Sequence, residues 1–354
     1  MGLDVTGRYR YPPPNPAWLA MAHEEVLEPG LPTIDAHHHL WEQDGVLYLL
    51  DEILADANSG HNIVSTVFVQ AHYGYRSSGP EHLRPVGETE QVARMRQQAR
   101  DAGATTDIAA AIVAFADLML GDAVDEVLHA HSVAARGALR GVRHSVSRDE
   151  NFPDGVVLRP APAGMLADRR YRDGLKRLKA HGLSYEAMLY HQQLPELTAL
   201  ACAMDDLPIV LDHIGCILGV GPYAGHEEET FHAWRQDMAK LAQCANVTVK
   251  IGGFGMIICG AHWHENPAPP SSDQLADAWR PYVETCIELF GPTRCMFESN
   301  FPVDKAMYSY RTLWNAFKRL TVDLSPSDRH ALFAGTAARS YRIEEPAELA
   351  IAHD

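Results

Sequence analysis

Short apolar runs alternate with longer amphipathic segments along most of the chain. The runs are rich in β-branched and other apolar residues, and the segments between them repeat their apolar positions at helical spacing. The apolar runs lie at residues 33–37, 63–71, 106–116, 139–146, 183–190, 208–213, 246–252 and 293–299. The amphipathic segments lie at residues 87–103, 121–137, 168–182, 193–204, 228–245, 272–291, 308–321 and 325–342.

This alternation predicts an α/β fold with a parallel sheet. Strands that are apolar almost throughout are typical of sheets buried on both faces, and eight such strands in series favour a (β/α)8 TIM barrel. A doubly wound open sheet is the second interpretation. No G-x-G-x-x-G or G-x-x-x-x-G-K-[ST] motif follows any of the runs, so the sequence offers no nucleotide-binding motif in support of it.

The predicted organisation is a single domain. Residues 1–32 are Pro-rich and form an N-terminal arm, residues 33–345 form the barrel, and residues 346–354 form a C-terminal tail. Two connections, 72–87 and 252–271, are unusually long. In a barrel both would lie over the C-terminal face and shape a substrate pocket.

Charge and cysteine usage narrow the classes of partner. The net charge is −16 with scattered Lys and Arg, which excludes an extended basic surface for nucleic acid and disfavours anionic membranes. No apolar run approaches the roughly 20 residues of a membrane-spanning helix, and the first residues lack the apolar core of a secretory signal. Six widely spaced cysteines without a C-x-x-C pair suit a reducing compartment. We expect a cytoplasmic protein that acts on a small molecule, and the arm leaves a homo-oligomer open.

Three consecutive histidines end the first predicted strand. Strand alternation predicts that Asp35, His37 and His39 project together into the lumen, while His38 points the other way. Two imidazoles converging from one strand form half of a metal site, and a neighbouring carboxylate could orient them. The alternative is a polyhistidine cluster at the surface, which the apolar residues on both sides disfavour.

Four segments together resemble the amidohydrolase superfamily. They are IDAHHHLW (34–41), LPIVLDHIGC (207–216), CMFESNFPVDK (295–305) and the loop YRSSGPEHLRPVGETEQV (75–92). The resemblance spans about residues 33–340 and is to the amidohydrolase-2 branch, which includes 2-pyrone-4,6-dicarboxylate lactonase and sugar lactonases. It implies a hydrolytic site at the C-terminal face, with His37, His39 and His213 at its centre and His191 as the fifth-strand histidine that completes a metal site in metal-dependent members.

The eighth strand departs from the pattern of this branch. The usual aspartate is replaced by Asn300, whose neutral amide cannot act as an anionic ligand or as a general base. Glu298, on the same face of the strand, and Asp304, beyond Pro302, are the carboxylates that could substitute. Glu298 has a second interpretation, which is a structural ion pair with Lys250 or Arg143.

Further polar residues follow other predicted strands. Arg143 could bind a substrate carboxylate or polarise a carbonyl, and Lys250 could stabilise an oxyanion, although both could instead form salt bridges. The resemblance favours a role in the pocket for His72. The remaining substrate-binding candidates are Tyr73, Arg76, Trp41 and His144, for which exposure or simple packing is the alternative.

The sequence therefore predicts a hydrolase that opens a lactone or similar cyclic ester of a small, anionic substrate. One divalent ion, zinc or manganese, could activate the water, or the reaction could proceed without metal. A decarboxylase or hydratase of a small carboxylic acid on the same scaffold is the alternative, followed by a non-catalytic binding barrel.

Overall fold

Eight parallel strands form a nearly closed barrel in the computed structural model, which describes residues 11–43, 45–152 and 159–344. The strands follow one another around the sheet in chain order. The barrel strands are β1 (Pro32–His38), β4 (Asn62–Val69), β5 (Asp107–Ala114), β6 (Leu139–Arg143), β7 (Ser184–Ala187), β8 (Ile209–Leu211), β9 (Val247–Ile251) and β10 (Cys295–Phe297). Each of the eight predicted strands is present, and the predicted (β/α)8 barrel is confirmed.

Closure of the barrel takes place between the first and the last strand. The backbone N–H of Asn300 donates to the carbonyl of His37 at 2.9 Å, and the N–H of His39 donates to the carbonyl of Phe301 at 2.7 Å. These hydrogen bonds satisfy backbone N–H and carbonyl groups of β1 and of the segment after β10, where the two are not joined by regular strand pairing. The three histidines therefore lie at the seam of the barrel.

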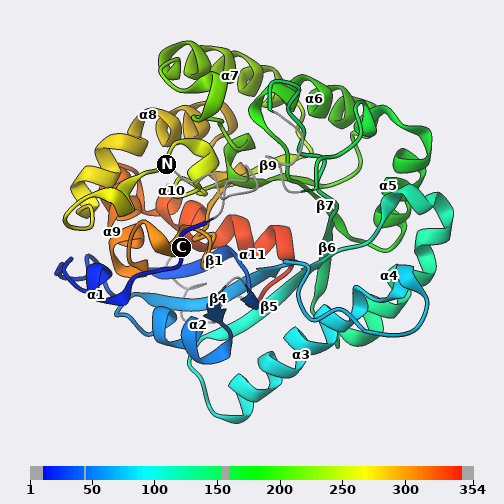
Figure 1. Cartoon of the computed structure of the whole chain (residues 1–354), viewed down its shortest axis with the longest axis horizontal. Helices are drawn as coiled ribbons and strands as arrows, with labels where there is room; N and C mark the ends of the chain where they lie inside the picture. Colours follow the sequence, from blue (N-terminus) through cyan, green and yellow to red (C-terminus); the bar gives the residue numbers. More distant parts are fainter. Residues whose placement is uncertain (1–10, 44, 153–158, 345–354) are drawn as a thin grey trace.

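Helices surround the barrel, and α3 to α8 follow one another around its periphery in Figure 1. The helices are α1 (Pro16–Leu19), α2 (Leu50–Ala57), α3 (Val86–Asp101), α4 (Val124–Ala134), α5 (Arg169–Ala180), α6 (Leu194–Ala203), α7 (Glu227–Leu241), α8 (Ser272–Phe290), α9 (Tyr310–Leu320), α10 (Pro326–His330) and α11 (Thr336–Tyr341). The chain also forms a hairpin of β2 (Trp41–Gln43) and β3 (Val46–Tyr48) directly after the histidines. No helix within the described ranges is long and apolar enough to cross a membrane.

The lumen is divided into an apolar and a charged part. Small apolar side chains from β1, β4, β5, β8 and β10 form one cluster with Ala334, Ala337, Ala338 and Tyr341 at the C-terminal end of the chain. Nearer the carboxyl ends of the strands, the lumen holds buried ionisable residues instead. A barrel has no other place where residues from so many strands can meet, so these charges concentrate at one point.

The described part of the N-terminal arm is attached to the barrel. Glu24 accepts hydrogen bonds from the N–H of Ser272 and from the amide of Asn315, and Lys318 donates to the carbonyls of Leu27 and Glu28. The predicted division into arm, barrel and tail remains a prediction, and the tail at 346–354 lies outside the described residues.

A substitution at Gly174, on α5, tests how closely this helix packs against the neighbouring segment of the chain. A Cβ at this position would lie 2.3 Å from the carbonyl oxygen of Leu118, a backbone atom that cannot move aside freely. We expect Gly174→Ala to lower the free energy of unfolding by about 1–3 kcal/mol, measured by urea denaturation. Gly30→Ala, where the new methyl group meets no atom within 4 Å, is the control and should change stability by less than about 0.5 kcal/mol. Equal effects of the two substitutions would contradict this packing.

Candidate active site

An irregularity near the end of β1 sets the direction of the histidines. The register of β1 on β4 shifts between Asp35 and His38, and this shift breaks the two-residue alternation. His37 and His39 face the lumen as predicted, whereas Asp35 does not share their face. Its carboxylate accepts hydrogen bonds from the N–H and hydroxyl of Ser299 and from the hydroxyl of Tyr310 on α9. The predicted grouping of Asp35 with the histidines was therefore wrong.

The lumen-facing histidines present their Nε2 atoms to each other. His39 Nδ1 lies 2.8 Å from the carbonyl oxygen of Val69, and His37 Nδ1 lies 3.0 Å from Glu298 Oε2. The carbonyl of Val69 requires a proton on Nδ1 of His39, so this neutral ring keeps its lone pair on Nε2. His37 Nδ1 lies between the Glu298 carboxylate and the ammonium of Lys250, whose Nζ is 3.3 Å away. The two Nε2 atoms lie only 3.2 Å apart. Burial lowers the pKa of His37 to about 4 and that of His39 well below its ordinary value, so both rings are neutral at pH 7.

His213 and Glu298 form a buried pair opposite His37. His213 lies in the short helical turn after β8 with a positive φ of 53°, and its Nδ1 lies 2.7 Å from Glu298 Oε1. Burial disfavours the charged form of His213, but the Glu298 carboxylate raises its pKa above the usual value. Burial also disfavours the Glu298 carboxylate, yet His213 and His37 lower its pKa to about 2. Glu298 is therefore ionised and leaves Nε2 of His213 free to accept a proton.

Lys250 and Arg143 neutralise the other acidic residues of the lumen. Lys250 Nζ lies 2.8 Å from Glu186 Oε2 and 3.2 Å from Asp212 Oδ1. Arg143 donates to the carbonyl of Gln70 at 2.6 Å, and its Nη1 lies 3.4 Å from Asp212 Oδ2. The alternative that Glu298 pairs with either cation is therefore wrong, because nearer carboxylates on β7 and after β8 occupy both.

Asn300 and Asp304 contact each other at the carboxyl end of β10. The Asn300 amide donates to Asp304 Oδ1 at 2.8 Å, while Asp304 Oδ2 accepts from the N–H of Gly255 and from the hydroxyl of Tyr308. Burial raises the pKa of Asp304 to about 7. Both oxygens hold neighbouring segments together, so Asp304 is less free than His213 to take a proton from water.

Three predicted site residues lie away from this centre. His191 begins a short helix four residues after the end of β7, and its Nδ1 accepts a hydrogen bond from the N–H of Leu218. His144 likewise accepts from the N–H of Leu118. Arg76 forms an ion pair with Glu90, and both side chains are more than a third exposed.

The other predicted pocket residues have mixed positions. The Trp41 ring stacks on His39 with centroids 5.3 Å apart, which places Trp41 beside the centre. His72 is held by the hydroxyl of Tyr75 at 2.7 Å, and its pKa is lowered to about 3 by burial and by the positive charges of Arg159 and Arg143. Tyr73 donates its backbone N–H to Glu88, which places its main chain but shows no contact of its ring with the centre.

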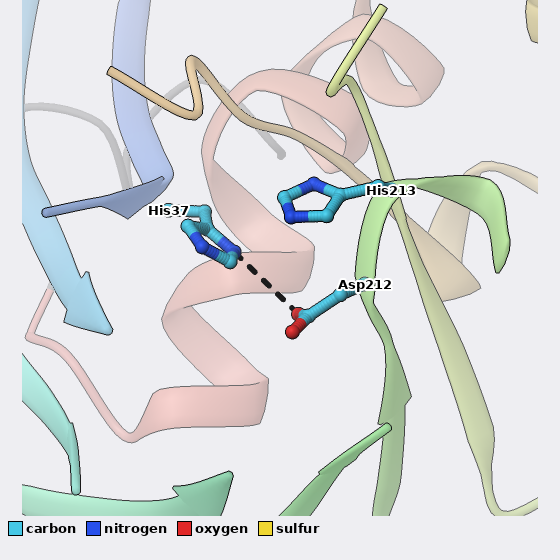
Figure 2. Close-up of side chains that lie close together, drawn as sticks. All are labelled: His37, Asp212 and His213. Carbon is cyan, nitrogen blue, oxygen red and sulfur yellow. Dashed lines mark ion pairs between the residues drawn. The ribbon is translucent and has the colours of Figure 1, made fainter. Parts of the chain in front are cut away.

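Two residues of the centre were not predicted as site residues. Asp212 follows the apolar Val210 by two positions, and Glu186 is an isolated acidic residue in the apolar run at 183–190. Strand alternation and the cost of burying a carboxylate were the signals that could have identified them. Together with His37 and His213, Asp212 belongs to a group of three residues that place one potential metal-ligand atom each within 4.8 Å of one another (Figure 2).

The residues present fit a divalent ion. Tetrahedral zinc with Zn–N distances of about 2.0–2.1 Å separates two nitrogen ligands by about 3.3 Å, close to the 3.2 Å between the Nε2 atoms of His37 and His39. His39 presents its Nε2 lone pair to this space, and the Nδ1-protonated form of His37 would present a second one for the ion. Arg143 Nη1, 3.4 Å from His37 Nε2, is a cationic proton donor beside the same two rings.

The fold and this polar centre define a barrel enzyme with its chemistry at the carboxyl ends of the strands. Residues 34–343 match the amidohydrolase family model, and the chain belongs to this family of hydrolases. The resemblance identified from the sequence motifs is thereby confirmed.

Curated relatives and solved structures agree with this assignment. The chain is 34% identical to protein y4mH of Sinorhizobium fredii over 88% of this chain and 98% of that protein. It is 29% identical to L-fucono-1,5-lactonase of Burkholderia ambifaria over 88% and 96%. A zinc-bound amidohydrolase from Burkholderia multivorans shares the fold with a TM-score of 0.67 at 23% identity, covering 88% of this chain and 99% of that one. The 5-carboxyvanillate decarboxylase of Sphingomonas paucimobilis also shares the fold, with a TM-score of 0.51 at 14% identity and coverage of 89% and 100%.

The Glu298 carboxylate should make stability depend on acid pH. Its pKa falls from 4.5 in the unfolded chain to about 2 in the folded one, so its contribution is present above pH 4.5 and is lost as pH falls through 2. We expect the stability difference between wild type and Glu298→Gln to shrink by about 2 kcal/mol from pH 6 to pH 3. Urea unfolding across this range measures it. A difference that stays constant with pH would contradict an ionised, paired Glu298.

Proposed function

We propose that this protein opens a lactone or similar cyclic ester by attack of water at the barrel mouth. One observation carries the proposal: a His213–Glu298 pair and a buried Arg143 converge on the same pair of neutral histidines. Such a site combines a proton acceptor with a cation that can stabilise negative charge, and ester hydrolysis needs both. The relationship to L-fucono-1,5-lactonase supports the same reaction class.

His213 is the proposed general base. Its Nδ1 is bound to Glu298, so Nε2 can take the proton of the attacking water, and the buried carboxylate then stabilises the imidazolium that forms. The Glu298 carboxylate raises the pKa of His213, which makes its Nε2 a stronger proton acceptor.

Arg143 is the proposed binding group for the carbonyl oxygen or for a substrate carboxylate. Its Nε is buried and has no hydrogen-bond partner among the described residues, while its terminal nitrogens are held by Gln70 and Asp212. A buried donor without an acceptor is unfavourable, and an oxygen atom of the substrate would satisfy it. Lys250 is paired with two carboxylates, so its proposed role is to stabilise the buried charges of the centre and not to bind substrate.

A divalent ion, when bound by His37 with His39 or Asp212, would polarise the lactone carbonyl and acidify a water molecule. In either case the chain supplies the proton acceptor and the guanidinium. Decarboxylation is the second candidate function, because a decarboxylase shares the fold, and a carboxylate-binding Arg143 would suit that reaction as well. Membership of a hydrolase family disfavours a barrel without chemistry.

Metal content tests the histidine pair. We expect about one zinc or manganese per chain in protein purified without a histidine tag, and loss of this metal in His37→Ala, measured by elemental mass spectrometry. His191→Ala removes a histidine outside the centre and should retain the metal. Active wild-type protein without metal would identify the histidines as a hydrogen-bonding centre instead.

Turnover tests the reaction and the base. We expect His213→Asn to lower kcat/KM for L-fucono-1,5-lactone or a simpler δ-lactone by about 10²- to 10⁴-fold, because removal of a general base has this effect. Acid release in a pH-stat assay measures the rate. His129→Asn, an exposed change on α4, is the control and should leave it unchanged. Release of carbon dioxide from a carboxylic acid, with no lactone turnover, would favour the decarboxylase.

A further inference from the structure

A cavity of about 400 Å³ lies beside His213 and outside the charged centre. Its walls come from the segment after β8, from the long connection after β9 and from α8. Small-molecule sites in proteins typically measure about 300–1,000 Å³. The cavity is therefore large enough for a ring-sized group.

The described walls of this cavity contain no Lys, Arg, Asp or Glu, in contrast to the lumen on the other side of His213. Its polar side chains include His262 and Asn266, both exposed. A charged or heavily hydroxylated group would lose hydration there without finding enough partners, so the cavity selects an uncharged, apolar group.

Aromatic rings form a rigid face of the cavity. Phe254 stacks on Trp279 with centroids 4.9 Å apart and an interplanar angle of 17°, and Tyr282 lies 6.3 Å from Phe254. Trp279 is buried and also contacts Tyr308 edge to face at 5.3 Å. Because these rings are already packed, a ligand ring would not have to order them, and aromatic rings favour such partners beyond their buried area.

His213 joins the cavity to the reaction centre. Its ring lies 4.6 Å from the ring of His37 on one side, and the residue lines the cavity together with Gly252 and Gly253. A Cβ on Gly253 would lie 2.7 Å from His213 Cβ, so glycine lets the imidazole and the loop approach closely. A substrate whose ester group lies at His213 could therefore extend a substituent directly into the cavity.

We infer that the cavity binds an uncharged aromatic substituent of the substrate, so the preferred lactone carries an aryl group and is not a polyhydroxylated sugar lactone. The inference rests on the proposed lactonase function and makes it more specific. The carboxylate or carbonyl of this substrate would lie toward Arg143, while its aryl ring would lie against Phe254 and Trp279.

Two lactones of the same ring size test the inference. We expect kcat/KM for δ-phenyl-δ-valerolactone to exceed that for δ-valerolactone by about 10- to 100-fold, after correction for their rates of alkaline hydrolysis, because burial of a phenyl ring contributes this much. L-fucono-1,5-lactone should be poorer than the phenyl compound. Equal or slower turnover of the phenyl compound, with the other lactones still hydrolysed, would overturn the inference and leave the proposed function standing.

A variant that narrows the cavity localises the effect. Ala278 is an exposed residue of α8 that lines the cavity, and Ala278→Leu should reduce the phenyl-to-unsubstituted ratio of kcat/KM at least fivefold. Ala233→Leu makes the same change at an exposed position of α7 that does not line the cavity, and it should leave the ratio unchanged. A ratio that stays the same in Ala278→Leu would place the phenyl group elsewhere and overturn the inference.

If no lactone is turned over, a direct binding measurement distinguishes failure of the aryl-binding inference from failure of the proposed lactonase function. The probe is 2-phenyltetrahydropyran, which has the ring and the phenyl group but no ester. We expect it to change the tryptophan fluorescence of the wild type, through Trp263 and Trp279, at concentrations where tetrahydropyran has no effect, and to bind more weakly to Ala278→Leu. Binding of both ethers alike would overturn the inference, whereas selective binding without any lactone turnover would overturn only the lactonase.

Discussion

The buried ammonium of Lys250 is the group on which the arrangement of the lumen depends. Lys250 is fully buried, and burial alone would favour its neutral form, but Asp212 and Glu186 raise its pKa instead. A buried charge is stable only with close partners of opposite sign, so β7, β9 and the end of β8 must keep their register. Glu186 also accepts a hydrogen bond from Tyr341, which connects this ion pair to α11. Removal of the Lys250 ammonium would leave the Glu186 carboxylate without a cationic partner among the described residues.

This ion-pair network also determines the state of the histidines. With Lys250 and Arg143 engaged by Asp212, the Glu298 carboxylate is left to bind His37 and His213 together. Through Nδ1 of His213 this carboxylate directs the free Nε2 of that ring, which is the arrangement that a general base requires. The chemistry of the site thus follows from how two cations are distributed among the buried acids.

Much of the fold could be predicted from the sequence, because eight apolar runs separated by amphipathic segments have few other solutions. The lumen-facing His37 and His39 were also predictable, since both lie at the end of an apolar strand. Asp35 was misplaced because a register shift within β1 cannot be seen in a pattern of period two. His191 was misplaced for a related reason, since it begins a short helix beyond the end of β7, and the pairing of Glu298 depended on carboxylates from other strands.

Asn300 shows how the site can lose an acidic residue and keep its negative charge. By the resemblance of its motif, this amide stands where the amidohydrolase-2 branch has an aspartate, and it donates to Asp304 and thereby fixes a neighbouring carboxyl group. Two residues earlier, Glu298 reaches the histidines from deeper in the lumen, where burial is complete and water cannot screen its charge. A carboxylate in that position acts through an imidazole and not directly on water. The substitution therefore favours His213 as the group that handles the proton, with Glu298 as the residue that orients and stabilises it.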